Sequence, residues 1–397
     1  MSDRPSRASL SSVYGAGLLQ GLAIVSFPAS ATVFRTWHGL GDEAYGSLFL
    51  PQTALTIVGS LLGGTLAARV GLRTLLVASC AITAASQLAL LSVAFIASAH
   101  ALPVLLIATG LAGLGFGLAA APLNALPAAL FPARGDSALL ALHTAIGAGF
   151  SVGPLLVGLL VSLGRWTLFP GLVAAAALAL AMAARRADLE SPSLPTGPRA
   201  GAAPSALLGL FALVAIFYAF AEGTFGNWAV VFLHEDRGLS DGMANAALSG
   251  FWAALTLGRL ASAALVTRVA SEKLWLAHPV AMIAAFFLLP LASGAVSGIA
   301  LFAFAGLACS GFFPLTVAIA TRRFAGSEAL VSSLLIAALM VGVGGGSFAL
   351  GALRGLGSFD FLYRLAAGYP LAALILGTLA LALAARTVPS RLRREIP

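Results

Sequence analysis

Apolar residues fill this sequence in long runs that short polar stretches separate. Each run is about twenty residues long, the length that an α-helix needs to cross the hydrocarbon core of a bilayer. Strands of a membrane barrel would alternate apolar and polar residues instead, and the sequence lacks that alternation. Because only helices and closed barrels satisfy their backbone polar groups in lipid, the pattern predicts an all-α membrane protein. Twelve runs are distinguishable, at residues 10–33, 45–68, 74–97, 103–130, 137–162, 166–184, 205–232, 243–266, 274–294, 296–320, 328–353 and 361–385.

The composition agrees with a membrane protein. Hydrophobic residues make up 60% of the chain and charged residues only 9%, whereas soluble domains carry about 25% charged residues. So few charges cannot cover a surface that faces water. This excludes a soluble enzyme, a nucleic-acid-binding protein and a disordered chain.

The basic residues, which give a net charge of +8, orient the predicted helices. Arginines gather in the connections that share a side with the two termini, and such a bias marks the cytoplasmic side. We therefore expect both termini in the cytoplasm. Alanine- and arginine-rich usage with a single lysine is typical of a GC-rich bacterial genome, which suggests the inner membrane of a bacterium. The basic residues expected on the outer side are Arg35, Arg165, Arg237, Arg354 and Arg364.

The first run has an alternative interpretation as a cleavable signal peptide. Arg4 and Arg7 precede it, and Ala29-Ser30-Ala31 near its end imitates a cleavage site. The apolar stretch from Leu10 is nevertheless long enough to cross the bilayer. We therefore expect it to be the first span.

A charged, proline-rich segment divides the runs into two sets of six. Such a segment cannot pack inside a membrane bundle and is typical of a linker. We expect an N-terminal half at residues 1–184, a cytoplasmic linker at 185–204, and a C-terminal half with a short basic tail at 205–397. A weak repeat supports this division, since Gly59, Leu61, Leu66, Arg69 and Val70 recur 199 residues later as Gly258, Leu260, Leu265, Arg268 and Val269.

A loop motif follows the second run, in Gly64-Thr-Leu66-Ala67-Ala68-Arg69-Val-Gly71-Leu72-Arg73. It resembles the motif Gly-x-Leu-Ala-Asp-Arg-x-Gly-Arg-Arg of the major facilitator superfamily. Ala68 and Leu72 depart from it, which puts in doubt any gating ion pair that needs the family's aspartate. Together with twelve runs and a long middle linker, the resemblance covers the whole chain. It implies a transporter of twelve helices in two pseudo-symmetric halves, with an inner gate at Arg69, Gly71, Arg73 and Arg268.

Three further stretches are similar to the fucose-permease branch of that superfamily, which contains sugar/proton symporters. They are Asn124–Pro132 followed by Leu142-His143, Tyr218–Trp228, and Gly311–Thr316. The sequence departs from the fucose permease where that protein has acidic residues, since Gln20 and Ala120 occupy the matching places. Fucose as the substrate and a relay of two carboxylates are therefore not expected.

Two strongly charged residues fall deep within predicted spans, where charge is costly and usually functional. Glu222 lies twelve residues before His234, and Arg259 lies nine residues before Arg268. Their depths are therefore similar, and a side chain as long as arginine is able to reach the carboxylate. We expect Glu222 to bind a proton and substrate and Arg259 to be its charge partner, although a purely structural pair is the alternative.

Aromatic and amide residues surround Glu222 in the sequence. Tyr218 and Phe225 lie four residues before it and three after it, on the same helix face, and we expect them beside the substrate. Asn227 and Trp228 are expected nearer the outside, in an outer vestibule. An anchor at the membrane interface is the alternative for Trp228.

The N-terminal half offers weaker candidates. Gln20 and Asn124 are expected to line the cavity, with a structural hydrogen bond between helices as the alternative. His143 is a candidate proton-binding group, although a lone histidine in a span is more often a packing residue. His278, beside Trp275, is expected at the membrane interface.

These observations predict a secondary active transporter that takes up a sugar or similar small polar solute with protons. The alternatives are proton-driven efflux of hydrophobic drugs or metabolites and, more remotely, a ligand sensor that does not transport. We expect a monomer whose partners are the small-molecule substrate, H+ and lipid, without nucleic acid. The sequence shows no nucleophile with its base and no cluster of metal ligands, so we expect no enzyme, cofactor or metal. Cys80 and Cys309 are expected to be buried and inert.

Overall fold

The computed structural model describes residues 6–189, 205–324 and 326–386. Of the predicted linker, residues 190–204 lie outside this part of the chain. The described residues form helices and contain no strand. The helices of the first half are α1 (Arg7–Ala29), α2 (Ala31–His38), α3 (Asp42–Ser47), α4 (Phe49–Val70), α5 (Leu72–Ser92), η1 (Val93–Phe95), α6 (Ser98–Leu130), η2 (Pro132–Arg134), α7 (Gly135–Ser162) and α8 (Leu168–Arg186). Those of the second half are α9 (Ala206–Val231), η3 (Phe232–Asp236), α10 (Asp241–Leu265), α11 (Ser271–Leu288), η4 (Leu289–Leu291), α12 (Ala295–Ser310), α13 (Phe312–Arg323), α14 (Glu328–Ala352), η5 (Arg354–Leu356), α15 (Phe359–Ala366) and α16 (Gly368–Arg386).

Twelve helical segments of the described chain are long and apolar enough to cross a membrane, which confirms the predicted all-α membrane architecture. Several predicted spans are interrupted, however. The first ends at Ala29 instead of continuing to residue 33, because Pro28 has no N–H for the helix and Ser30 leaves helical geometry. The second is split at Leu48 into α3 and α4, the tenth at Gly311 into α12 and α13, and the twelfth at Ala367 into α15 and α16.

The same pairing of helices occurs in both halves. In the first half α1 packs on α7, and α4 packs on α6. In the second half α9 packs on α14, and α10 packs on α12, which are the corresponding spans. The weak sequence repeat therefore accompanies a repeated packing arrangement.

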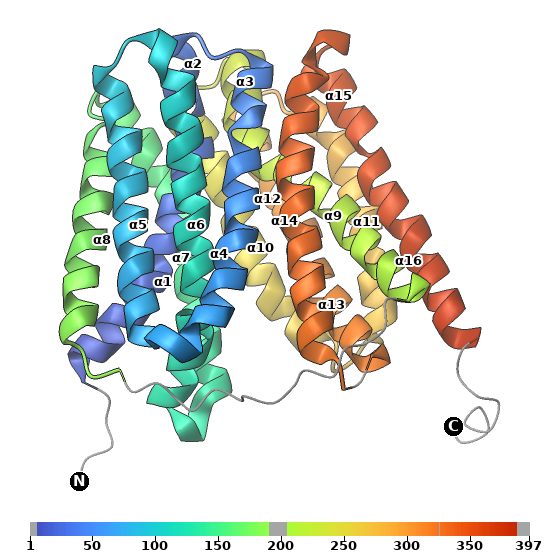
Figure 1. The fold of residues 1–397 in the computed structure, drawn as a ribbon. Coiled ribbons are helices and arrows are strands. Elements are labelled where there is room, and N and C mark those ends of the chain that lie inside the picture. The colour runs from blue at the N-terminus through green and yellow to red at the C-terminus, as the bar shows by residue number, and fades with distance from the viewer. Residues whose placement is uncertain (1–5, 190–204, 325, 387–397) are drawn as a thin grey trace.

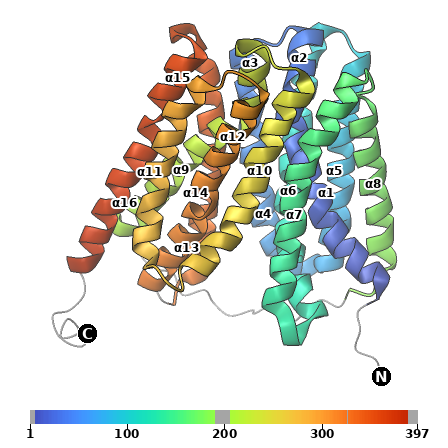
Figure 2. The same ribbon diagram turned by 180° about the vertical axis from the view of Figure 1, so that it is seen from behind.

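The two halves meet along two seams. One joins α7 to α10, as Figure 2 shows, and the other joins α3 and α4 to α14. We call the end of the bundle where α1 begins and α16 ends the terminal end, and the opposite end, near α2, α3 and α15, the far end (Figure 1). In Figure 1, α4 and α14 lie closest toward the far end and diverge toward the terminal end.

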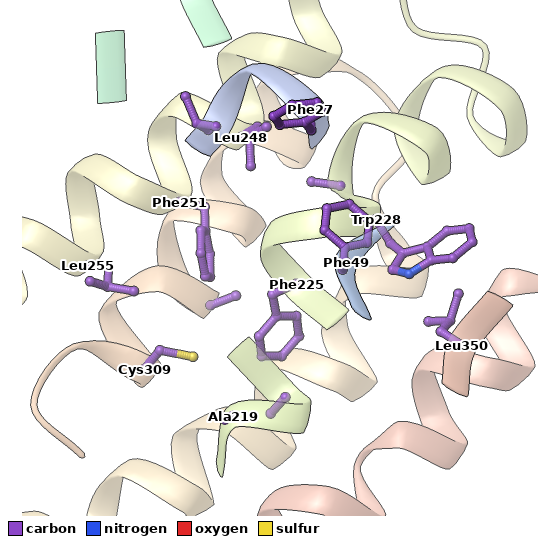
Figure 3. Close-up of a cluster of buried hydrophobic side chains, with 14 of the residues drawn as sticks. Phe27, Phe49, Ala219, Phe225, Trp228, Leu248, Phe251, Leu255, Cys309 and Leu350 are labelled. Carbon is purple, nitrogen blue, oxygen red and sulfur yellow. The ribbon is translucent and has the colours of Figure 1, made fainter. Parts of the chain in front are cut away.

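The buried apolar residues form two clusters, of which only one joins the halves. One large cluster includes Phe34 and Phe49 of the first half together with Phe225, Trp228 and Phe251 of the second, so it joins the halves. Figure 3 shows part of this cluster. A second cluster, with members on α1, α4, α5, α6, α7 and α8, belongs to the first half alone.

Candidate functional site

The centre of α9 carries the tyrosine and glutamate that the sequence singled out. Tyr218 is fully buried, and its hydroxyl donates a hydrogen bond of 3.0 Å to the carbonyl oxygen of Cys309 on α12. Its ring stacks on Phe312 of α13 with centroids 5.1 Å apart. Tyr218 therefore holds α9 against both sides of the break in the tenth span.

Glu222 lies one helical turn further along α9 and is partly exposed. Its carboxyl group is near enough to the Tyr218 hydroxyl to act on it both as a charge and as a hydrogen-bonding partner. Glu222 also acts electrostatically on Cys309. Cys309 lies two residues before Gly311, so the glutamate is within electrostatic range of the helix break.

Arg259 of α10 belongs to the same cluster without forming a direct ion pair with Glu222. Its side chain is exposed, and its charge acts on both Tyr218 and Cys309. Within the described residues, the ion pairs do not include one between Arg259 and Glu222. The guanidinium group is therefore a neighbour of the cluster, available to another anion.

His143 extends this electrostatic neighbourhood into the first half. It lies on α7, its side chain is exposed, and it is within electrostatic range of Arg259 on α10. The α7–α10 seam thus brings ionisable groups from both halves together. Asn124 of α6 is also exposed, and its amide donates to the carbonyl oxygen of Ala120 one turn earlier, at 2.8 Å.

His278 packs beside the break at Gly311. It is buried within the second half, where its Nδ1 bonds to the Ala308 carbonyl at 2.8 Å. A Cβ atom on Gly311 would come within 2.5 Å of both His278 Nε2 and Ser262 Oγ. Glycine at this position therefore allows α11 and α10 to approach the break.

Asn227 and Trp228 lie in a closed contact between the halves rather than in an open vestibule. The Trp228 indole donates to the Ser347 carbonyl at 2.9 Å, and the Asn227 amide donates to the Ser347 hydroxyl at 2.7 Å. Tyr45 of the first half donates to the Asn227 carbonyl at 2.6 Å. The Tyr45 ring meets the Trp228 ring edge-on at 5.0 Å. These contacts join α3 of the first half to α9 and α14 of the second.

A network of charged groups closes the far end above this contact. Arg35 of α2 pairs through two nitrogens with Glu235 of η3 and also lies 2.9 Å from Asp42 of α3. Arg354 reaches the other oxygen of Asp42 at 3.4 Å while resting on the Phe359 ring. Burial works to lower the pKa of Arg35, but the hydrogen bond and charge of Glu235, with Asp42, outweigh it and raise that pKa. Arg35 is therefore a permanent cation that ties the two halves together.

Other predicted residues lie within a single half. The Gln20 amide donates to the Thr83 hydroxyl at 3.1 Å between α1 and α5, so it joins helices and is fully buried. Phe225 stacks on Phe286 of α11 with centroids 4.0 Å apart and is likewise buried. Both occupy the positions of packing residues in this conformation.

The four residues of the predicted inner gate lie at the terminal end. Gly71 turns the chain between α4 and α5 with φ +81°, a conformation that favours glycine. Arg73 donates to the Ala187 carbonyl after α8 at 3.4 Å. Arg69 and Arg268 are exposed at the ends of their segments.

Several residues of the far end escaped the sequence analysis. The sequence identifies Arg35 and Arg354 only as outer basic residues and indicates no role for Asp42, Glu235 or Tyr45. The available signal was that the outer connections contain few charged residues, because the acids and arginines that share these connections are natural ion-pair partners. The partner of each was hidden, since Arg35 and Glu235 lie 200 residues apart in the sequence.

The fold and this arrangement define a multi-pass membrane protein with a transporter fold. The chain belongs to the Major Facilitator Superfamily, whose family model matches residues 13–302. It is similar in structure to the nucleoside transporter NupG, with TM-score 0.73, 14% identity, and coverage of 95% of this chain and 99% of that one. The D-xylose-proton symporter gives TM-score 0.70 and 17% identity, with 94% and 96% covered. A bacterial homologue of the human lysosomal transporter Spinster gives TM-score 0.70 and 17% identity, with 96% of each chain covered. No curated protein matches the chain in sequence.

Proposed function

We propose that this protein is a proton-coupled transporter that takes up a sugar, nucleoside or similar small polar solute by alternating access. The observation that carries the proposal is Glu222, a carboxyl group deep in a membrane span beside the Tyr218 hydroxyl and near the cationic Arg259. An acid in such surroundings is costly and is therefore usually functional. The printed names of two structural neighbours, a xylose–proton symporter and a nucleoside transporter, support hydroxylated solutes as the substrate class.

Tyr218 couples protonation of Glu222 to the contact between α9 and α12. Its hydroxyl has one hydrogen, which it donates to the Cys309 carbonyl, so its oxygen is free to accept from a protonated Glu222. When Glu222 loses its proton, the carboxylate becomes the stronger acceptor, and the hydroxyl turns toward it. The Cys309 carbonyl at the helix break is then released. Protonation of one side chain thereby changes a contact between α9 and α12.

Alternating access follows from the asymmetric contact between the halves. The far end is held by the Arg35 network and the Tyr45–Asn227 bond, whereas α4 and α14 diverge toward the terminal end (Figure 1). We assign the terminal end to the cytoplasm on the distribution of arginine, so the end at which these contacts hold the halves together faces outward. Residues 185–204 link the halves, and Arg69, Gly71, Arg73 and Arg268 belong to the inner gate. The protein acts as a monomer in a bacterial inner membrane, without enzymatic activity or a cofactor.

The test is a thermal-shift screen of purified protein against monosaccharides, nucleosides and hydrophobic drugs, repeated across pH with Glu222→Gln. We expect a polar solute to stabilise the wild type in a pH-dependent way and the variant independently of pH. Glu43→Gln, which removes an exposed carboxylate at the far end, is the matched control and keeps the wild-type profile. If Glu222→Gln keeps the wild-type pH profile, Glu222 is not the group that couples protonation to ligand binding.

The direction of transport is tested separately in everted vesicles. A solute that enters whole cells together with protons supports uptake. A hydrophobic drug that dissipates the pH gradient of everted vesicles would instead support the efflux alternative.

A further inference from the structure

A cavity of about 220 Å³ lies at the far end, between the two halves and apart from the Glu222 cluster. The first half contributes Thr32 and Trp37 of α2 and Trp166, and the second half contributes His234 of η3 and Asp241 of α10. Glu222 lies twelve residues before His234 along the same helical segment, which corresponds to about 18 Å. The cavity is thus distinct from the proposed transport site.

Asp241 gives this cavity a negative charge without a permanent cationic partner. Its Oδ1 is buried and accepts no hydrogen bond, and it lies 3.8 Å from His234 Nδ1. That nitrogen bonds to the Leu239 carbonyl at 2.9 Å and therefore carries a hydrogen, and the histidine is charged only when doubly protonated. The nearby arginines Arg35 and Arg237 are already paired with other carboxylates.

Polar and aromatic groups complete the lining. Thr32 is only 3% exposed, and its Oγ1 has no hydrogen-bond partner, which is unfavourable for a buried hydroxyl. Trp37 and Trp166 meet edge-to-face at 5.5 Å beside it. A carboxylate close to indole rings is the combination that binds organic ammonium ions. Arg165 precedes Trp166 in sequence but does not line the cavity.

We propose that this cavity binds a small hydroxylated organic cation, and that binding holds the far end closed. The ammonium group lies against Asp241 and the indoles, and a hydroxyl on the ligand satisfies Thr32. Because the lining comes from both halves, opening of the far end separates Thr32 and Trp37 from Asp241 and dismantles the site. A ligand that binds only one conformation shifts the population toward it. The site therefore restrains transport from a position apart from the Glu222 cluster.

Choline is the probe, and 3,3-dimethyl-1-butanol, which has carbon in place of the charged nitrogen, is its neutral control. We expect calorimetry on the purified full-length protein to show choline binding, with the neutral analogue at least about tenfold weaker. Asp241→Asn should weaken choline binding about tenfold. Glu43→Gln removes the same charge at the same end without lining the cavity and should change the dissociation constant by less than about twofold. Equal binding of the two compounds, no binding of choline, or an unaffected Asp241→Asn variant would each overturn the site.

The effect on conformation is measured with Thr53→Cys. Thr53 is buried against Gly344 where the halves meet, so a thiol there becomes accessible when the far end opens. Both native cysteines are buried, and the wild-type protein provides the blank. Choline should slow labelling by a membrane-impermeant maleimide several-fold in Thr53→Cys, and the slowing should vanish when Asp241→Asn is added. Labelling that choline leaves unchanged or accelerates would refute the closing role. Neither readout depends on proton coupling, so the result is separable from that of Glu222→Gln.

Discussion

The Tyr218 hydroxyl is the residue-scale feature that connects protonation to helix movement in the proposed cycle. The hydroxyl donates its hydrogen to the Cys309 carbonyl, while Glu222 lies beside the hydroxyl oxygen of Tyr218. The other tyrosines of the second half do not lie between a glutamate and the carbonyl at the helix break. Tyr369, for example, packs its ring edge-on against Phe220. A variant without the hydroxyl therefore isolates its contribution.

Tyr218→Phe should separate packing from coupling. The ring keeps its stacking on Phe312, so we expect a loss of about 1 kcal/mol in unfolding free energy from one hydrogen bond. The pH dependence of ligand stabilisation should flatten, because protonation of Glu222 no longer redirects a donor. Thermal unfolding across pH with the best ligand measures both effects. Tyr369→Phe is the control and should keep the wild-type pH profile; an identical profile in Tyr218→Phe would contradict the relay.

At the scale of elements, the apolar pattern predicted the spans but not their interruptions. Runs of apolar residues located twelve spans, because hydrocarbon requires that length and composition. The split at Gly311 coincides with Pro314, which has no N–H to donate to the Ser310 carbonyl four residues earlier, so a proline marks this break in the sequence. The approach of His278 and Ser262 to Gly311 from α11 and α10 is a tertiary contact that the sequence does not reveal.

The candidate site shows the same limit. Periodicity correctly places Glu222 near Tyr218, since residues four apart share a helix face. It could not distinguish Gln20 as a cavity residue from Gln20 as a partner of Thr83, 63 positions away. Nor could it reveal that Asn227 meets Ser347, 120 positions away. In the sequence alone, a polar residue within a span is a candidate for a specific role. Only its tertiary contacts show whether it lines a binding site or packs against another helix.

The contact between α9 and α14 allows a prediction at this scale. A Cβ atom on Gly223 would lie 2.5 Å from the backbone oxygen of Val343, so Gly223→Ala must push the helices apart. We expect a loss of about 1–3 kcal/mol in unfolding free energy, as for other overpacked interiors. Gly209→Ala is the control on the same helix, where a Cβ meets nothing within 4 Å. It should be neutral or stabilising by up to about 1 kcal/mol. Denaturant unfolding in detergent measures both, and equal stability of the two variants would argue against close packing at Gly223.

At the scale of the whole molecule, the conformational equilibrium depends on the contacts that hold the two halves together at the far end. Both clusters of ion pairs at this end contain an arginine, but they differ in what they join. Arg35 connects α2 of the first half to Glu235 of the second, whereas Arg237 pairs with Asp236 and Asp360 within the second half. Only the first cluster opposes separation of the halves. Loss of Arg35 should therefore shift the conformational equilibrium, and loss of Arg237 should not.

Arg35→Ala should open the far end. The network is only partly exposed and involves two hydrogen bonds to Glu235, so its removal is expected to favour the open state by about 1–2 kcal/mol, roughly five- to thirtyfold in population. Labelling of Thr53→Cys by the impermeant maleimide should accelerate accordingly, because the thiol becomes accessible as α4 leaves α14. Arg237→Ala, which removes the same charge at the same end, should label at the rate of the parent. If the two variants label equally fast, the ion pairs between the halves do not hold the far end closed, and the apolar contact of Tyr45 with Trp228 becomes the stronger candidate for the gate.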